Sequence, residues 1–172
     1  MNIFFNPLKT NGTEGEQIRI GRTKEGTIFE MLTFVLLVMM WAVAAWVFFH
    51  ASDTVATHFD LKGEANGYGN RWGIIIVAAV GTLVTVLCLV GAYSPQRAVN
   101  LPVKIKNVQQ NMIASRMMRV IAALAALLFT NVILMMGMPD APLPRYLLFV
   151  TVGLTIAAPI VLTVLVVRTR NR

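Results

Sequence analysis

Four long apolar runs constrain this chain more than any other feature of its sequence. A helix needs roughly 20 apolar residues to cross a bilayer core about 30 Å thick, and four runs meet this length: 28–49, 72–93, 117–137 and 146–167. Because the runs are continuous rather than alternating, they predict helices and argue against a membrane β-barrel. We therefore expect an all-α polytopic membrane protein whose four helices form one membrane domain, 28–167.

The composition supports the same class. Only 13% of the 172 residues are charged, whereas soluble domains carry about 25%, so the lipid bilayer is the first expected partner. The single cysteine, Cys88, lies within the second apolar run, which excludes an intramolecular disulfide and a cysteine-based metal site. No cofactor is expected.

Lysine and arginine are distributed unevenly among the connecting segments. All of them except Lys62, Arg71 and Arg145 lie in the arm 1–27, in or beside the loop 94–116, or at the end of the chain, 168–172. Because cytoplasmic segments retain positive charge, we expect a cell-membrane protein with both termini in the cytoplasm and the loop 50–71 facing outward. The first apolar run exceeds a signal-peptide core of about 7–15 residues and is expected to remain as an anchor.

The net charge of +7 does not indicate nucleic-acid binding, because the basic residues lie beside span ends and are not interleaved with stacking aromatics. Anionic lipid is the more suitable partner. The segments 1–8 and 101–115 are candidates for the inner leaflet; alternatives are a helix extension and a tether.

A stripe of small residues on the second run predicts close helix packing and a homodimer contact. Its members recur at helical spacing: Ala78, Gly81, Thr82, Thr85, Cys88 and Ala92.

Polar groups inside the third and fourth runs predict one interhelical contact. Asn131 needs a partner from another helix, and Pro159 frees the carbonyl of Thr155 and predicts a kink. This region supports either a single hydrogen bond or the path of a small-molecule transporter. No charged residue lies near the centre of a span, which argues against an ion-coupled carrier.

The loop 50–71 contains most of the reactive groups expected on the outer side. Its glycines and the Asn66-Gly67 pair predict a turn or hairpin against the mouth of the bundle. Two alternatives are a structural plug, with His58 and Tyr68 on helix-end carbonyls, and a metal-assisted enzyme using His58, Asp60 and Glu64. Neither the zinc signatures nor a nucleophile motif is present, so we expect no enzyme.

The same loop resembles an uncharacterised membrane domain, DUF1648-like, found in the N-terminal half of SdpI-type immunity and signalling proteins. The resemblance covers about 29–93 and rests on His58, Phe59, Gly63, Gly67, Tyr68, Gly69 and Arg71. The prolines that usually precede the histidine in that family are absent here, and nothing after Ser94 matches the second half of the immunity proteins.

The resemblance implies recognition of an extracellular or periplasmic ligand, either a peptide or a lipid-derived molecule. The residues that match the family, together with Asp60, are the candidate ligand-binding set. Phe59 and Tyr68 would supply apolar contact, and Arg71 or Lys62 would pair with an anionic group.

Overall fold

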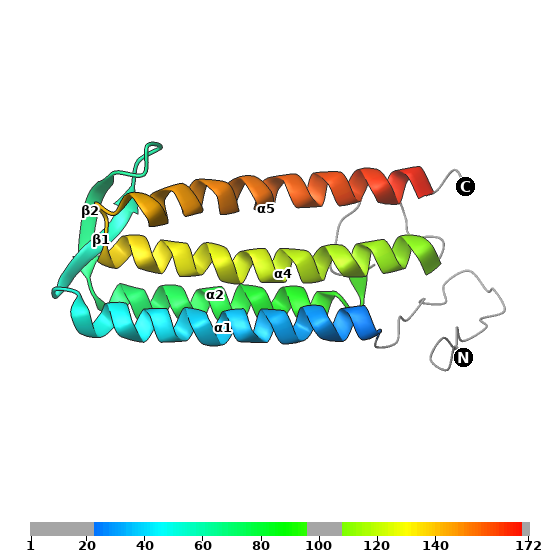
Figure 1. The fold of residues 1–172 in the computed structure, drawn as a ribbon, viewed down its shortest axis with the longest axis horizontal. Coiled ribbons are helices and arrows are strands. Elements are labelled where there is room, and N and C mark those ends of the chain that lie inside the picture. Colours follow the sequence, from blue (N-terminus) through cyan, green and yellow to red (C-terminus); the bar gives the residue numbers. More distant parts are fainter. Residues whose placement is uncertain (1–22, 96–107, 170–172) are drawn as a thin grey trace.

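A computed structural model describes residues 23–95 and 108–169 of the chain. Four helices run side by side along one axis, and a two-stranded hairpin closes one end (Figure 1). In chain order the elements are α1 (Lys24–His50), β1 (Thr54–Phe59), β2 (Ala65–Asn70), α2 (Trp72–Gly91), α4 (Val108–Gly137) and α5 (Pro142–Arg168). All four helices are long and apolar enough to cross a membrane, which confirms the expected all-α class.

Two helices begin well before the apolar runs that predicted them. In α1 the Thr23 hydroxyl accepts the amide of Gly26 at 3.0 Å and so caps the helix ahead of its apolar part. In α4 the helix already begins at Val108, so 108–115 is an extension of the third span. The remainder of 101–115 and the segment 1–8 lie outside the described residues.

Helix α5 likewise starts at Pro142, where a proline is tolerated because the first amides of a helix have no intrahelical acceptor. It continues as one helix through Pro159 to Arg168.

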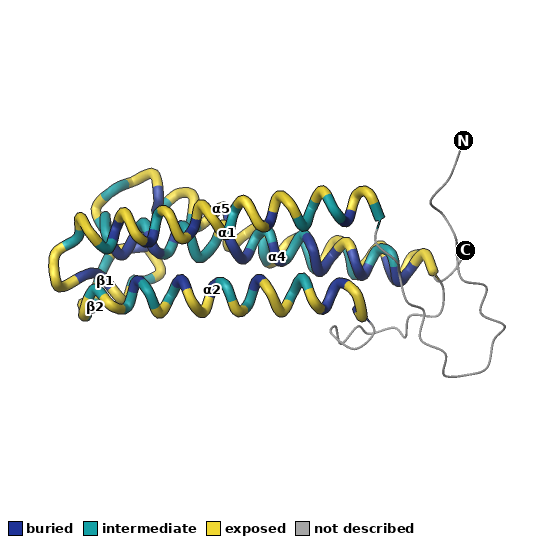
Figure 2. The backbone as a smooth tube through the Cα atoms, turned by 90° about the horizontal axis from the view of Figure 1, so that it is seen from below, coloured by how far each residue is buried: buried dark blue, intermediate teal, exposed yellow. Residues whose placement is uncertain are grey.

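Helix α4 is the centre of the assembly. It packs against α1, α2 and α5, whereas α5 packs mainly on α4. Figure 2 shows the buried positions concentrated along α4, with longer exposed stretches on the helices around it. Small side chains allow this close approach, and four alanines of α4 are at most 5% exposed: Ala114, Ala122, Ala125 and Ala126.

Part of the small-residue stripe of α2 packs against another helix of the same chain. Ala78, Gly81 and Thr85 are buried, and a Cβ at Gly81 would lie 2.7 Å from Cγ of Phe129 on α4. The stripe therefore predicts close helix packing correctly, but the partner is α4.

The apolar core lies toward the hairpin. Its buried members come from three helices and β1: Met40, Ala44, Val47, Val55, Ile74, Ala78, Ile133 and Met136. Because Val55 belongs to this cluster, the hairpin is packed onto the helices. The hairpin crosses the end of the bundle from α1 toward the start of α5 (Figure 1).

Candidate functional site

The expected hairpin is present between α1 and α2. Strands β1 and β2 pair antiparallel from Thr54 with Asn70 to Phe59 with Ala65, and the register is irregular at His58. At the tip the Asp60 amide donates to the Glu64 carbonyl at 2.9 Å. Gly63 has φ +77°, which glycine adopts without strain. The matched glycine at this position is therefore required by the turn.

Asp60 holds the turn through its side chain. Its Oδ1 accepts the amides of Lys62 and Glu64, both at 2.8 Å. The hydrogen bond from the Glu64 amide is the largest cause lowering the pKa of Asp60 below its usual 3.8, with the Lys62 amide and charge adding to it. Asp60 thus holds the turn through Oδ1.

Two glycines of β2 leave room for side chains of β1. A Cβ at Gly67 would lie 2.9 Å from Cβ of His58, and a Cβ at Gly69 would lie 2.9 Å from Cγ2 of Thr57. Nδ1 of His58 contacts Oδ1 of Asn66 across the hairpin. The His58 ring is therefore hydrogen-bonded to Asn66 within the hairpin rather than to a helix-end carbonyl.

The helix-end contact expected of His58 is made by His50 instead, whose Nδ1 lies 2.8 Å from the Trp46 carbonyl oxygen. The set His58, Asp60 and Glu64 does not assemble either. Within 23–95 and 108–169, no group of three or more His, Cys, Asp or Glu side chains is arranged to hold a metal ion.

Arg71 fixes the base of the hairpin. Its Nη1 lies 3.4 Å from Oδ1 of Asp53, and its amide donates to the Asp53 carbonyl at 3.0 Å. The guanidinium also lies 5.1 Å from the ring centre of Phe48 on α1, a cation–π distance. This arginine is therefore already occupied by partners within the chain.

The apolar side chains of the hairpin that remain free are at its tip and on β2. Leu61 is 98% exposed and Tyr68 is 62% exposed, while Phe59 is half-buried. Phe49 and Trp72, at the helix ends that flank the hairpin, are also exposed. A pocket of about 110 Å³ lies where α1 and α4 end, and Trp46, His50 and Met138 line it. This volume is below the roughly 300 Å³ of the smallest typical ligand cavities.

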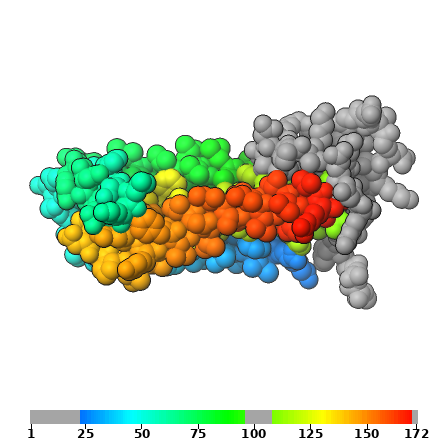
Figure 3. Space-filling model, turned by 90° about the horizontal axis from the view of Figure 1, so that it is seen from above, coloured from blue at the N-terminus to red at the C-terminus, as the bar shows by residue number. Residues whose placement is uncertain are grey.

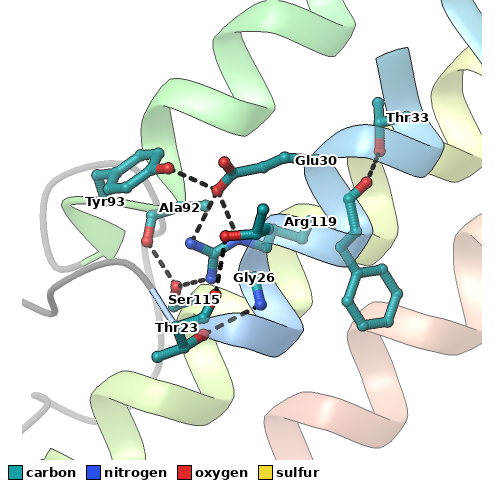
Figure 4. A network of polar contacts seen from close by, with 10 residues as sticks. Thr23, Gly26, Glu30, Thr33, Ala92, Tyr93, Ser115 and Arg119 are labelled. Carbon is teal, nitrogen blue, oxygen red and sulfur yellow. Dashed lines mark hydrogen bonds and ion pairs between the residues drawn. The ribbon is translucent and has the colours of Figure 1, made fainter. Parts of the chain in front are cut away.

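A second polar site lies at the opposite end of the bundle, near the start of α1 (Figure 4). Oε1 of Glu30 accepts hydrogen bonds from the Tyr93 hydroxyl at 2.6 Å and from Nε and Nη2 of Arg119, each at 3.2 Å. Nη1 of Arg119 donates to the Ser115 hydroxyl at 2.7 Å, which donates to the Ala92 carbonyl at 2.7 Å. We call Glu30, Tyr93, Ser115 and Arg119 the Glu30–Arg119 cluster.

The cluster joins α1, α4 and the end of α2 through a buried charge. Arg119 is 3% exposed and lies 5.3 Å from the ring centre of Tyr93. A Cβ at Gly26 would lie 2.8 Å from Cζ of Arg119, so glycine is needed where the guanidinium passes α1. Polar contacts between helices stabilise a bundle in lipid. The Glu30–Arg119 cluster makes such contacts between α1, α4 and the end of α2.

Sequence reasoning missed this cluster. In the sequence, Arg119 counts only among the basic residues in or beside the loop 94–116, and no role is assigned to Glu30. One signal was present: both residues lie inside predicted apolar runs, near ends expected on the same side of the membrane. Opposite charges in that arrangement favour a buried pair.

The intramembrane polar residues form a different contact from the expected one. Nδ2 of Asn131 lies 3.5 Å from Oγ1 of Thr151, and the Thr155 hydroxyl donates to the Thr151 carbonyl at 2.7 Å. The expected partner of Asn131 is the carbonyl of Thr155, which Pro159 frees. The observed partner is Thr151, one turn earlier in α5. The observed arrangement is one long hydrogen bond between α4 and α5.

Comparison with known proteins identifies one domain within the chain. Residues 35–82, which cover most of α1, the hairpin and half of α2, match the family described as Domain of unknown function (DUF1648). The resemblance seen in the sequence is thus confirmed for a DUF1648-like domain. No curated protein and no solved structure matches the chain.

Proposed function

We propose that this DUF1648-like chain is a non-enzymatic, multi-pass protein of the cell membrane that recognises a peptide or lipid-derived ligand through its hairpin. The role would be immunity or signalling, as the resemblance to SdpI-type proteins implies. The observation that supports this most is a hairpin held firmly at its tip and base that still exposes Leu61 and Tyr68.

The hairpin is suited to recognition because its backbone is held before any ligand arrives. Asp60 fastens the tip, Arg71 fastens the base, and Val55 anchors the first strand in the core. A preorganised surface loses less conformational entropy on binding than a free loop. A ligand can therefore bind the exposed apolar side chains without first ordering the hairpin.

The pocket beside Trp46 and His50 is too small to enclose the proposed ligand. A space of about 110 Å³ cannot enclose a molecule with more than a few heavy atoms. An extended peptide or an amphiphile lying across Leu61, Tyr68 and Trp72 needs no such cavity. The aromatic rings suit a ligand at the membrane surface, where one side of a ring is wet.

The orientation that the proposal needs follows from the charge distribution. The start of α1 and the end of α5 lie at the end of the bundle opposite the hairpin (Figure 1). Basic residues dominate the sequence before α1, between α2 and α4 and after α5, and the positive-inside rule assigns these segments to the cytoplasm. The hairpin then faces outward.

Photocrosslinking from the hairpin tip tests the proposal. A photoreactive amino acid replaces Leu61, whose side chain is almost fully exposed, and adducts formed in intact cells are identified by mass spectrometry. The matched control carries the same group at Phe34, which is 66% exposed on the side of α1. We expect a discrete peptide or lipid-derived adduct from position 61 and only bulk phospholipid from position 34.

Tyr68→Ala in the chain labelled at position 61 should abolish the discrete adduct without lowering the amount of protein in the membrane. The same bulk-lipid adducts from both positions would contradict the proposal. A membrane-impermeant maleimide provides the orientation control: Leu61→Cys in a Cys88→Ser background should react in intact cells. Reaction only after permeabilisation would place the hairpin on the wrong side.

A further inference from the structure

Arg145, in the first turn of α5, is a cation without a carboxylate partner among the described residues. The ion pairs among the described residues join Arg71 to Asp53, Arg116 to Glu25 and Arg119 to Glu30. The one hydrogen bond that the structure gives Arg145 runs from Nη2 to the Pro139 carbonyl at 3.3 Å, and its buried Nε has no acceptor.

The position of Arg145 ties it to the hairpin. A Cβ at Gly63 would lie 2.9 Å from Cγ of Arg145 and 3.5 Å from Cε2 of Phe149, so the hairpin tip rests on this part of α5. Figure 3 shows the hairpin packed beside the start of α5. Arg145 is therefore part of the surface from which Leu61 and Lys62 project.

The part of α5 that carries Arg145 also carries exposed apolar side chains, and Phe149, four residues on, shares the face of Arg145. Leu143 is 66% exposed, Tyr146 is 69% exposed and Phe149 is 46% exposed. Exposed aromatic and aliphatic side chains at the end of a membrane helix contact the region between head groups and acyl chains. A guanidinium among them can reach an anionic head group while the neighbouring side chains contact hydrocarbon.

The electrostatics also favour an anion here. A partly buried arginine lacking an acceptor on a buried nitrogen carries an uncompensated desolvation cost. The start of α5 adds a positive helix dipole, and Ala141 at the cap position supplies no side-chain acceptor. Phosphate oxygens suit the guanidinium because two parallel N–H groups can bind them together.

We propose that Arg145 binds the phosphate of an anionic membrane lipid beneath the hairpin tip, so that an acidic amphiphile forms part of the recognition surface. The inference deepens the proposed function by naming the chemistry of one ligand at that site. It also replaces Arg71 as the residue that pairs with an anionic group, because Arg71 already binds Asp53 and Phe48.

Lipid titration of the purified full chain tests this inference. The chain in detergent micelles is titrated with phosphatidic acid or with phosphatidylcholine, and bound lipid is counted by native mass spectrometry. We expect phosphatidic acid to bind at least tenfold more tightly than phosphatidylcholine. Arg145→Gln should remove that preference, and Arg145→Lys should weaken binding less because it keeps the charge but loses the planar fork.

The control is Arg116→Gln, which removes the same charge from the other end of the bundle and should change the affinity less than twofold. Equal losses for Arg145→Gln and Arg116→Gln would overturn the inference, because binding would then follow net charge. Full displacement of the lipid by an equal concentration of inorganic phosphate would overturn the assignment to a lipid. Photocrosslinking at position 61 does not depend on this lipid, so the two proposals can fail separately.

Discussion

The two ends of the bundle use charged residues in opposite ways. At the hairpin, Arg71 pairs with an Asp53 side chain that is 88% exposed, and the contact holds a surface element in place. At the other end, the Arg119 and Glu30 side chains are 4% and 15% exposed and join three elements. The comparison indicates that one end displays a surface, while the other holds the helices together.

The largest expected effect comes from removing one charge of the buried pair. Arg119→Leu removes the guanidinium that lies 3.2 Å from Oε1 of Glu30, and breaking a buried pair costs about 3–5 kcal/mol. The free energy of unfolding in mixed micelles measures the loss. The control Arg116→Leu breaks an exposed pair with Glu25, for which about 0–1 kcal/mol is typical. Similar losses for both variants would remove the distinction between the two ends.

The next largest loss of stability is expected where α2 packs closely against α4. Gly81→Ala places a Cβ 2.7 Å from Cγ and 2.8 Å from Cβ of Phe129, and overpacking of this kind costs about 1–3 kcal/mol. Gly153→Ala on α5 is the matched control, because no atom lies within 4 Å of its added Cβ. The same unfolding measurement should show a loss only for the first variant. Equal stability of the two would show that α2 and α4 do not need the small side chain.

Acid should loosen the hairpin tip before it affects the bundle. Because the folded state lowers the pKa of Asp60, this carboxylate stabilises the turn above pH 3.8 and the stabilisation is lost as the pH falls through the folded value. The protection of the Lys62 and Glu64 amides against hydrogen exchange, relative to an unstructured chain at the same pH, should therefore fall below about pH 3.8. Asp60→Ala, which removes the acceptor of both amides, should show low protection at every pH. Unchanged protection in that variant would contradict the role assigned to the carboxylate.

The smallest loss of stability is expected for Tyr68→Ala, the variant for which we expect the greatest loss of ligand recognition. Tyr68→Ala removes an exposed ring, and such surface changes usually alter stability by less than about 0.5 kcal/mol. The free energy of unfolding should stay near that of the wild type while the discrete crosslink from position 61 disappears. A loss of several kcal/mol would instead make Tyr68 a structural residue of the hairpin end.

The candidate site was only partly predictable from sequence. Glycines and the Asn66-Gly67 pair predicted a turn or hairpin, because backbone reversal is a local property. The partners of individual side chains were not local. Asn131 contacts Thr151 rather than the Thr155 carbonyl, and His58 contacts Asn66 rather than a helix end. Such choices depend on how two elements rotate and slide against each other.

The sequence by itself determined that four helices of membrane length exist, because a continuous apolar run long enough to cross a bilayer needs no partner to satisfy its backbone. Only the tertiary structure decided that α4 is central, that Arg119 is buried against Glu30, and that Arg145 lies under the hairpin tip without a carboxylate. In lipid these arrangements depend on close packing and on individual polar contacts rather than on exclusion from water. Hydropathy patterns do not encode that information.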